Sequence, residues 1–153
     1  MQITKENIDT FIKGTIMNCE FMDITKIDFI PKGITRLCCN DNLLTSLPKL
    51  PESLIRLYCG SNQLTELPKL PESLMYLNCY DNNNLTELPK LPESLKDLDC
   101  YNNNLTELPK LPENLVYLNC DNNNLPYKVT LDNYKEKHNK FIKRKEILSK
   151  ICG

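Results

Sequence analysis

A unit of 20 residues repeats through most of this chain and restricts its fold more than any other feature. With x for a variable position, its frame is LxxLxCxxNxLTxLPxLPxx, first complete at residues 34–53. One unit, residues 74–94, carries an extra Asn, and a fainter unit lies one period before residue 34. We therefore count one degenerate unit and about five readable ones. Repetition at such a period is typical of solenoids, in which each unit packs on its neighbours.

The two halves of the frame predict different backbone structures. In LxxLxC the second Leu and the Cys are two residues apart, so both point to one side of a β-strand. In LTxLPxLP the two prolines exclude an α-helix and predict an extended, polyproline-like return. An Asn after each strand offers an amide to the turning backbone, in the column Asn42, Asn62, Asn83, Asn103 and Asn123. The expected fold is an α/β solenoid with a parallel sheet on its concave face, extended convex returns and helical caps at both ends.

This frame resembles the leucine-rich repeat, whose signature is LxxLxLxxNxL within 20 to 29 residues. The resemblance covers roughly residues 14–125, and the LPxLPxxL half is similar to the short repeats of bacterial secreted effectors of the YopM and IpaH type. The Cys-bearing frame is also similar to leucine-rich repeats of giant-virus proteins. The resemblance implies that the concave sheet carries a protein partner, and that the chain is a scaffold or adaptor engaging proteins of another cell.

The repeats divide the chain into segments 1–13, 14–125 and 126–153. Because both ends of a solenoid need covers, residues 1–13 are expected to form an N-terminal helical cap with Ile8, Phe11 and Ile12 on one face. Residues 126–153 are expected to form a basic C-terminal capping helix that begins at Asp132 or Asn133. The side of this helix that packs on the repeats is predicted to contain Tyr134, His138, Phe141, Ile142, Leu148 and Ile151.

Six cysteines share one position of the frame: Cys19, Cys39, Cys59, Cys79, Cys100 and Cys120. We predict a column of small buried side chains, because free Cys is among the most buried residue types. Disulfides are less favoured, since stacked strands lie about 4.8 Å apart and a disulfide prefers Cβ atoms about 3.8 Å apart. A straight column does not surround a metal ion, and a nucleophilic thiol needs exposure and a basic neighbour. We therefore predict no catalytic residue, no metal site and no cofactor. Cys38, facing outward from the sheet, and Cys152, next to the C-terminus, are expected to be incidental thiols, the alternative being a redox-sensitive contact.

The N-terminus lacks the apolar core of a secretory signal, and no run approaches the roughly 18 apolar residues of a membrane span. Eight cysteines without a secretory signal favour a reducing, cytoplasmic location, which includes the cytosol of a host cell. Residues 1–125 hold 11 Lys/Arg and 17 Asp/Glu, a net charge of −6, whereas residues 126–153 hold 8 and 3, a net charge of +5. Since the repeats are acidic, neither nucleic acid nor a membrane is the expected partner.

Alternation along the strands predicts the surface that a partner contacts. Five of the seven tyrosines fall at outward positions, with arginines toward the N-terminal end and aspartates toward the C-terminal end. Tyr and Arg are enriched at interface hot spots, although Tyr is also a good strand former that stacks along a sheet without any partner. The candidate partner-binding residues are Arg36, Arg56, Tyr58, Tyr76, Tyr80, Asp97, Asp99, Tyr101 and Tyr117.

The predicted function is a protein–protein interaction scaffold without enzymatic activity. One alternative is a fragment of an effector-type ubiquitin ligase, because effectors of the IpaH type add a large catalytic domain after their repeats. The 28 residues that follow the repeats are too few for such a domain, and a reading frame that continued past Gly153 would favour it. A second alternative is an electrostatic contact of residues 126–153 with an acidic partner, nucleic acid or an anionic membrane.

Overall fold

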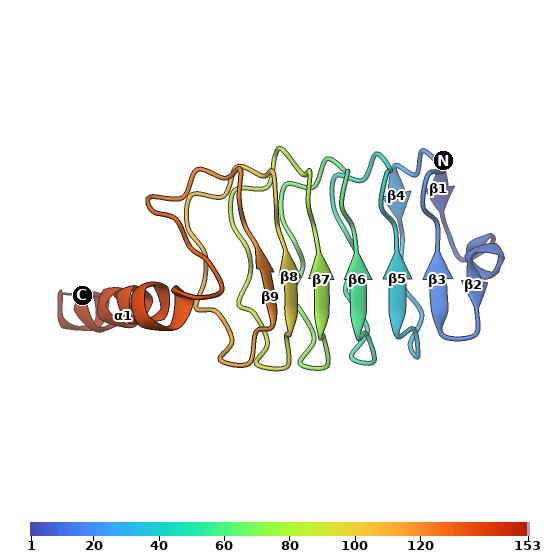
Figure 1. The fold of residues 1–153 in the computed structure, drawn as a ribbon. Coiled ribbons are helices and arrows are strands. Elements are labelled where there is room, and N and C mark those ends of the chain that lie inside the picture. The colour runs from blue at the N-terminus through green and yellow to red at the C-terminus, as the bar shows by residue number, and fades with distance from the viewer. Residues whose placement is uncertain (153) are drawn as a thin grey trace.

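The computed structural model describes residues 1–152, with Cys152 described by its backbone alone. Successive turns of the chain stack along one axis, so that their strands stand in a row and the C-terminal helix lies beyond the last of them (Figure 1). The row is a seven-stranded sheet in the order β2-β3-β5-β6-β7-β8-β9. These strands are β2 (Ile12–Lys13), β3 (Ile16–Asn18), β5 (Arg36–Cys38), β6 (Arg56–Tyr58), β7 (Tyr76–Asn78), β8 (Asp97–Asp99) and β9 (Tyr117–Asn119). The predicted parallel-strand solenoid is confirmed.

The strands pair one repeat apart. Leu37 lies beside Leu57, then Leu77, Leu98 and Leu118, and every pair from β3 to β9 is parallel. In β5 to β8 the central Leu is buried and its two neighbours are half-buried. The alternation predicted from LxxLxC therefore holds, with one side of each strand facing the core and the other facing outward.

The six column cysteines lie in the core, where each is at most 5% exposed. The seven cysteines with described side chains, including half-buried Cys38, are free thiols. Burial raises the pKa of the Cys19 thiol to about 12 and that of Cys120 to about 11, and it raises the pKa of Cys79 well above its usual value. The prediction of a buried column is confirmed, whereas the prediction for the Cys152 thiol lies outside the described side chains.

A ladder of asparagines, buried except for half-buried Asn123, links each turn to the next. Asn62 Nδ2 donates to the carbonyls of Cys39, Cys59 and Gly60, and its Oδ1 accepts from the Leu44 amide at 3.0 Å. Each ladder Asn reaches the carbonyl three residues before it, as Asn62 reaches Cys59. The ladder residues are Asn42, Asn62, Asn82, Asn103 and Asn123.

The prediction that Asn83 belongs to this ladder was wrong. Asn82 is fully buried and donates to the Cys79 carbonyl at 3.1 Å, whereas Asn83 is exposed. The distance from the strand decides the choice, because only Asn82 stands three residues after Cys79. The extra residue of this turn is accommodated after the ladder, at Asn83 and Asn84, before Leu85 returns to the core.

The proline-containing returns contain no helix among the described residues and point their leucines inward, as predicted. In one return Leu64 is fully buried and Leu67 and Leu70 are 7% and 2% exposed. A serine at the end of the return adds a link between turns, since Ser73 Oγ donates to the Leu54 carbonyl at 2.7 Å. Equivalent bonds join Ser53 to Ile34 and Ser94 to Leu74. This second ladder was not predicted.

The N-terminal cap is only partly helical. A 3-10 helix, η1 (Ile8–Phe11), precedes β2, which runs antiparallel to β3. The predicted position of Ile12 on a helix was wrong, because Ile12 pairs with Met17 in the sheet. The edge of β3 offers unpaired backbone groups, and an added strand satisfies them where a helix would not. A separate pair, β1 (Gln2–Ile3) and β4 (Lys26–Ile27), lies alongside and is parallel.

The C-terminal cap begins with a π-helix, η2 (Tyr134–Asn139), and continues as α1 (Lys140–Cys152). Asn139 locks η2 onto the last return, since its side chain both accepts from the Leu111 amide and donates to the Leu111 carbonyl, at 3.0 and 2.9 Å. His138 is 2% exposed and lies 2.8 Å from the Pro109 carbonyl and 2.9 Å from the Tyr127 hydroxyl. The buried histidine therefore has a structural role.

Only the first part of the predicted apolar side packs on the repeats. Tyr134 is 1% exposed, whereas Phe141, Leu148 and Ile151 are 46%, 60% and 73% exposed. The prediction that Leu148 and Ile151 cover the repeats was wrong, because α1 extends away from the row of strands and both side chains stay exposed (Figure 1). No helix among residues 1–152 has the length and apolar character needed to span a membrane.

Candidate partner-binding surfaces

The outward side chains of strands β5 to β9, with the residue two positions after each strand, form one surface that we call the sheet face. All nine predicted partner-binding residues belong to this sheet face. Most are half-buried, while Tyr101 and Tyr117 are 37% and 45% exposed. Because neighbouring strands are in register, these residues form continuous rows across the sheet.

Aromatic side chains on the sheet face are held by their neighbours. The Arg56 guanidinium lies over the Tyr76 ring, 4.6 Å from its centroid, in a cation–π contact. The Tyr80 ring lies against Gly60, where a Cβ atom would be 2.4 Å from the ring. Gly60 thus makes room for Tyr80, a role that the repeat position alone did not indicate. Tyr101 is oriented by a bond from Asn122 Nδ2 to its hydroxyl, 2.8 Å long.

The C-terminal half of the sheet face is acidic. Burial, reinforced by the charge of Asp99, raises the pKa of Asp97 above its ordinary range. Burial also raises the pKa of Asp99; the backbone N–H of Tyr101 opposes this effect and the charge of Asp81 adds to it. Strands β7, β8 and β9 contain no Lys or Arg. These carboxylates are therefore partly desolvated charges that a cationic group would stabilise.

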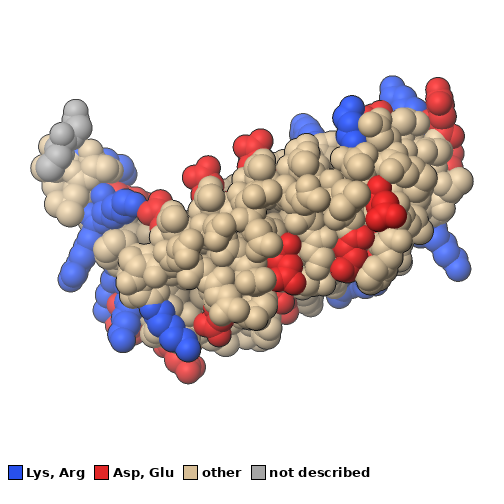
Figure 2. Space-filling model, turned by 90° about the horizontal axis from the view of Figure 1, so that it is seen from above, with Lys and Arg blue, Asp and Glu red and all other residues tan. Residues whose placement is uncertain are grey.

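Charge is also unevenly distributed on the face of the molecule that Figure 2 shows. Seen from above, acidic side chains are spread along the middle of the solenoid, and Lys and Arg gather toward its two ends (Figure 2). At the C-terminal end the basic residues belong to α1 and η2, and nearly all of them are exposed. Lys145 pairs with Glu107, and Lys140 pairs with Glu136 within the helix. The remaining basic side chains of α1 face solvent and form a second candidate surface.

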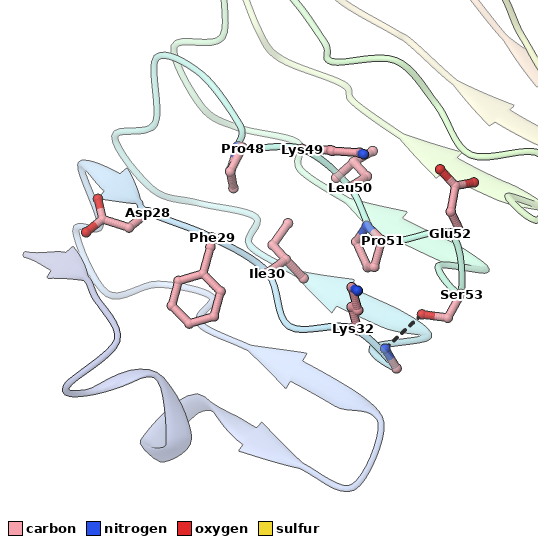
Figure 3. A pocket seen from close by; sticks show the side chains of 11 residues that line it. Asp28, Phe29, Ile30, Lys32, Pro48, Lys49, Leu50, Pro51, Glu52 and Ser53 are labelled. Carbon is pink, nitrogen blue, oxygen red and sulfur yellow. Dashed lines mark hydrogen bonds between the residues drawn. The ribbon is translucent and has the colours of Figure 1, made fainter.

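A third surface, which sequence reasoning missed, is a groove of about 480 Å³ between the first two returns. Phe29 and Ile30 of one return line it together with Pro48, Leu50 and Pro51 of the next (Figure 3). The Gly33 amide donates to Ser53 Oγ at one end, 3.2 Å away. Phe29 occupies the repeat position at which the later returns carry a lysine, at Lys49, Lys69, Lys90 and Lys110. An aromatic residue at this position was the sequence signal for the groove.

Comparisons with known proteins agree with this architecture. No protein-family model matches the sequence, and no curated protein matches it. Among solved structures, YopM from Yersinia enterocolitica WA-314 superposes with a TM-score of 0.70 and 38% sequence identity, over 72% of this chain and 24% of that one. A Shigella effector LRR domain superposes with a TM-score of 0.72 and 35% identity, over 84% of this chain and 57% of that one.

The chain thus spans about a quarter of the YopM chain and somewhat more than half of the Shigella domain. Within that span it shares their fold and about a third of their residues. The repeat frame, the parallel sheet and these two likenesses identify the chain as a leucine-rich-repeat protein whose repeats are similar to those of the two bacterial proteins.

Proposed function

We propose that this chain is a protein–protein interaction scaffold whose partner lies across the sheet face, and we assign it no catalytic role. The observation that carries the proposal is a set of tyrosines on the sheet face that contact ordered neighbours: Tyr76 with Arg56, Tyr80 with Gly60, and Tyr101 with Asn122. Side chains that are already ordered lose little conformational entropy when a partner binds, which favours affinity. The leucine-rich repeats of the two similar bacterial proteins support a scaffold of this kind.

The charge order of the sheet face gives the proposed contact a direction. Arg36 and Arg56 lie on β5 and β6, whereas Asp97 and Asp99 lie on β8. A partner with acidic groups opposite the arginines and basic groups opposite the aspartates fits in one orientation only. We further propose that the protein acts in the cytosol, including that of a host cell, because a reducing compartment keeps its free thiols reduced.

Replacing Tyr58, Tyr76 and Tyr101 together by Ala is expected to weaken partner binding about 100-fold or more, because aromatic hot spots each contribute more than about 1 kcal/mol. The thermal midpoint should stay within about 5 °C of the wild type, since none of the three side chains lies in the core. Affinity capture with quantitative mass spectrometry, followed by titration of the captured partner, measures both effects.

The matched control replaces Lys49, Lys69 and Lys90 of the convex returns by Ala, which removes three exposed side chains away from the sheet face. This control should bind like the wild type. A triple-tyrosine variant that captured the same partner with unchanged affinity would contradict the assignment of the sheet face.

A second candidate function is an electrostatic contact through α1, favoured by the exposure of its basic residues Lys143, Arg144 and Lys150. Binding of a polyglutamate peptide should weaken roughly tenfold between 50 and 200 mM salt if this surface contributes, because ion pairing releases counterions. Neutralising Lys143, Arg144 and Lys150 to Gln should remove that salt dependence, whereas the same change at Lys49, Lys69 and Lys90 should not. Affinity that is indifferent to salt would exclude this function.

A further inference from the structure

The two edges of the seven-stranded sheet differ in how they are paired. At the N-terminal edge, β2 runs antiparallel to β3 and covers it. At the other edge, β9 is the last strand, and no residue within 1–152 pairs with its outer side. Val116, directly before β9, is 68% exposed. The helix α1 extends beyond β9 (Figure 1) but forms no strand there.

The backbone groups that join each turn to the next lack partners at β9. The amides of Cys79 and Cys100 both donate to a carbonyl of the following strand at 2.8 Å, whereas the Cys120 amide makes no backbone hydrogen bond within residues 1–152. The Lys96 carbonyl accepts from two amides of the following turn, at 2.7 and 3.0 Å. The equivalent carbonyl of Val116 accepts from none in that range.

The open groups of β9 define a register for one more strand. Tyr117 donates to the Lys96 carbonyl and the Asn119 carbonyl accepts from Cys100, so both residues bond toward β8. By the alternation of parallel strands, the amide and carbonyl of Leu118 point to the open side. The carbonyl of Val116, both groups of Leu118 and the amide of Cys120 thus form an unpaired edge. Such an edge is a template for strand addition.

The side chains next to this edge select a basic segment. Tyr117 is 45% exposed, exposed Asp121 lies two residues after the strand, and Asp97 and Asp99 lie on the adjacent strand. Strands β7 to β9 carry no Lys or Arg to neutralise these acids. The sheet already contains one arginine–tyrosine contact between neighbouring strands, because Arg56 of β6 stacks on Tyr76 of β7. An arginine on an added strand beside Tyr117 would repeat this chemistry.

We propose that the open edge of β9 binds an extended basic segment of a partner protein as an additional parallel strand. Arg or Lys would alternate with apolar residues in this segment. The basic side chains lie beside Tyr117 and Asp121 on the sheet face, and the apolar ones cover partly buried Leu118. The added strand widens the sheet face, so this proposal rests on the proposed function and names the chemistry of its partner.

A fluorescent peptide with the sequence Lys-Val-Arg-Val-Arg-Val-Lys is a direct probe, titrated by anisotropy against the full chain. The edge variant is Val116→Lys with Asp121→Lys, since both residues are exposed and edge lysines block strand addition. Its matched control is Met22→Lys with Asp23→Lys, the same charge change on an exposed apolar–acidic pair at the opposite end. The second probe is the same peptide N-methylated on alternate residues, which keeps its charge and removes edge hydrogen bonds.

The wild type and the control variant should bind the peptide, and both the edge variant and N-methylation should weaken binding about tenfold or more. Equal affinity for the N-methylated peptide would overturn the proposal in favour of charge attraction alone, and equal binding by the edge variant would overturn the assignment to β9. Sedimentation without peptide tests whether a second copy of the chain binds the edge of β9 instead. A wild-type dimer that becomes a monomer in the edge variant would show this and would overturn the proposal.

The two proposals fail independently. If the peptide does not bind while the triple-tyrosine variant still loses its partner, only the edge assignment is wrong. If the peptide binds through β9 while the triple-tyrosine variant keeps its partner, only the sheet-face assignment is wrong.

Discussion

Replacing Asn82 by Ala should lower the free energy of unfolding by about 3–5 kcal/mol, the range of losses caused by breaking a buried hydrogen-bond network. The Asn82 side chain is fully buried and bonds four backbone groups: it accepts from the Leu64 amide at 3.0 Å and donates to the carbonyls of Cys59, Cys79 and Tyr80. Alanine removes all four bonds. The Leu64 amide then has no partner among the described residues, whereas the carbonyls of Cys59, Cys79 and Tyr80 each keep one bond, from Asn62, Asn103 and Ser61.

The neighbouring Asn83→Ala is the matched control, because Asn83 is exposed and its side chain bonds nothing within the ladder. Its effect should be within about 0.5 kcal/mol. Urea unfolding followed by circular dichroism measures both variants. If the two substitutions cost the same, the ladder is not the element that links this turn to its neighbours.

Raising the pH from 9 to 10 should cost about 4 kcal/mol of stability through four buried thiols, roughly 1 kcal/mol for each. Burial raises the pKa of Cys39, Cys59, Cys79 and Cys100 well above 9.0. In the unfolded chain these thiols ionise near pH 9, whereas in the folded chain they keep their protons. The unfolded state therefore binds fewer protons, and stability that is fully present below pH 9 is lost as the pH rises.

Urea unfolding at pH 8, 9 and 10 with a reductant present measures this slope. Replacing Cys59 and Cys79 by Ala should reduce the loss of stability between pH 9 and 10 by about 2 kcal/mol, whatever the substitutions cost at pH 8 through lost packing. Because the comparison uses the slope, a cavity left by the missing sulfur atoms does not mimic the result. A slope that is the same with two thiols fewer would show that the buried column is not the source.

The repeated part of this fold was predictable, because each turn restates the same constraints. The spacing of Leu and Cys fixed the buried side of every strand, and the prolines excluded helices from the returns. The one error within the repeats came from three consecutive asparagines. Counting back from Leu85 selects Asn83, whereas the hydrogen bond to the Cys79 carbonyl requires Asn82. The position of the Cys79 carbonyl at the end of the strand therefore decides which asparagine joins the ladder, and the repeat frame alone does not.

The caps were less predictable because they occur once. Helical spacing at Ile8, Phe11 and Ile12 predicted a helix, but the unpaired edge of β3 draws Ile12 into β2. In α1 the spacing of Leu148 and Ile151 predicted burial, yet both side chains stay exposed because no part of the repeats lies against that side of the helix. Helical periodicity identifies an apolar side of a helix but does not provide the surface that covers it.

The sheet face was predicted in its membership but not in its contacts. Alternation placed all nine residues on one side, but the packing of Tyr80 on Gly60 depends on a close approach between strands. The raised pKa of Asp97 depends on burial and on Asp99, and such effects follow from three-dimensional positions. The open edge of β9 likewise depends on the backbone bonds between successive turns, which residue types alone do not reveal.

The most direct test of the sheet face as the partner-binding surface is site-specific photocross-linking. A benzoylphenylalanine introduced at Tyr76 faces outward from β7, and one at Lys69 lies on the exposed side of a return. If the partner lies across the sheet, irradiation should yield a cross-linked partner from position 76 and none from position 69. Adducts from position 69 alone, or equal yields from both positions, would contradict a binding surface on the sheet face.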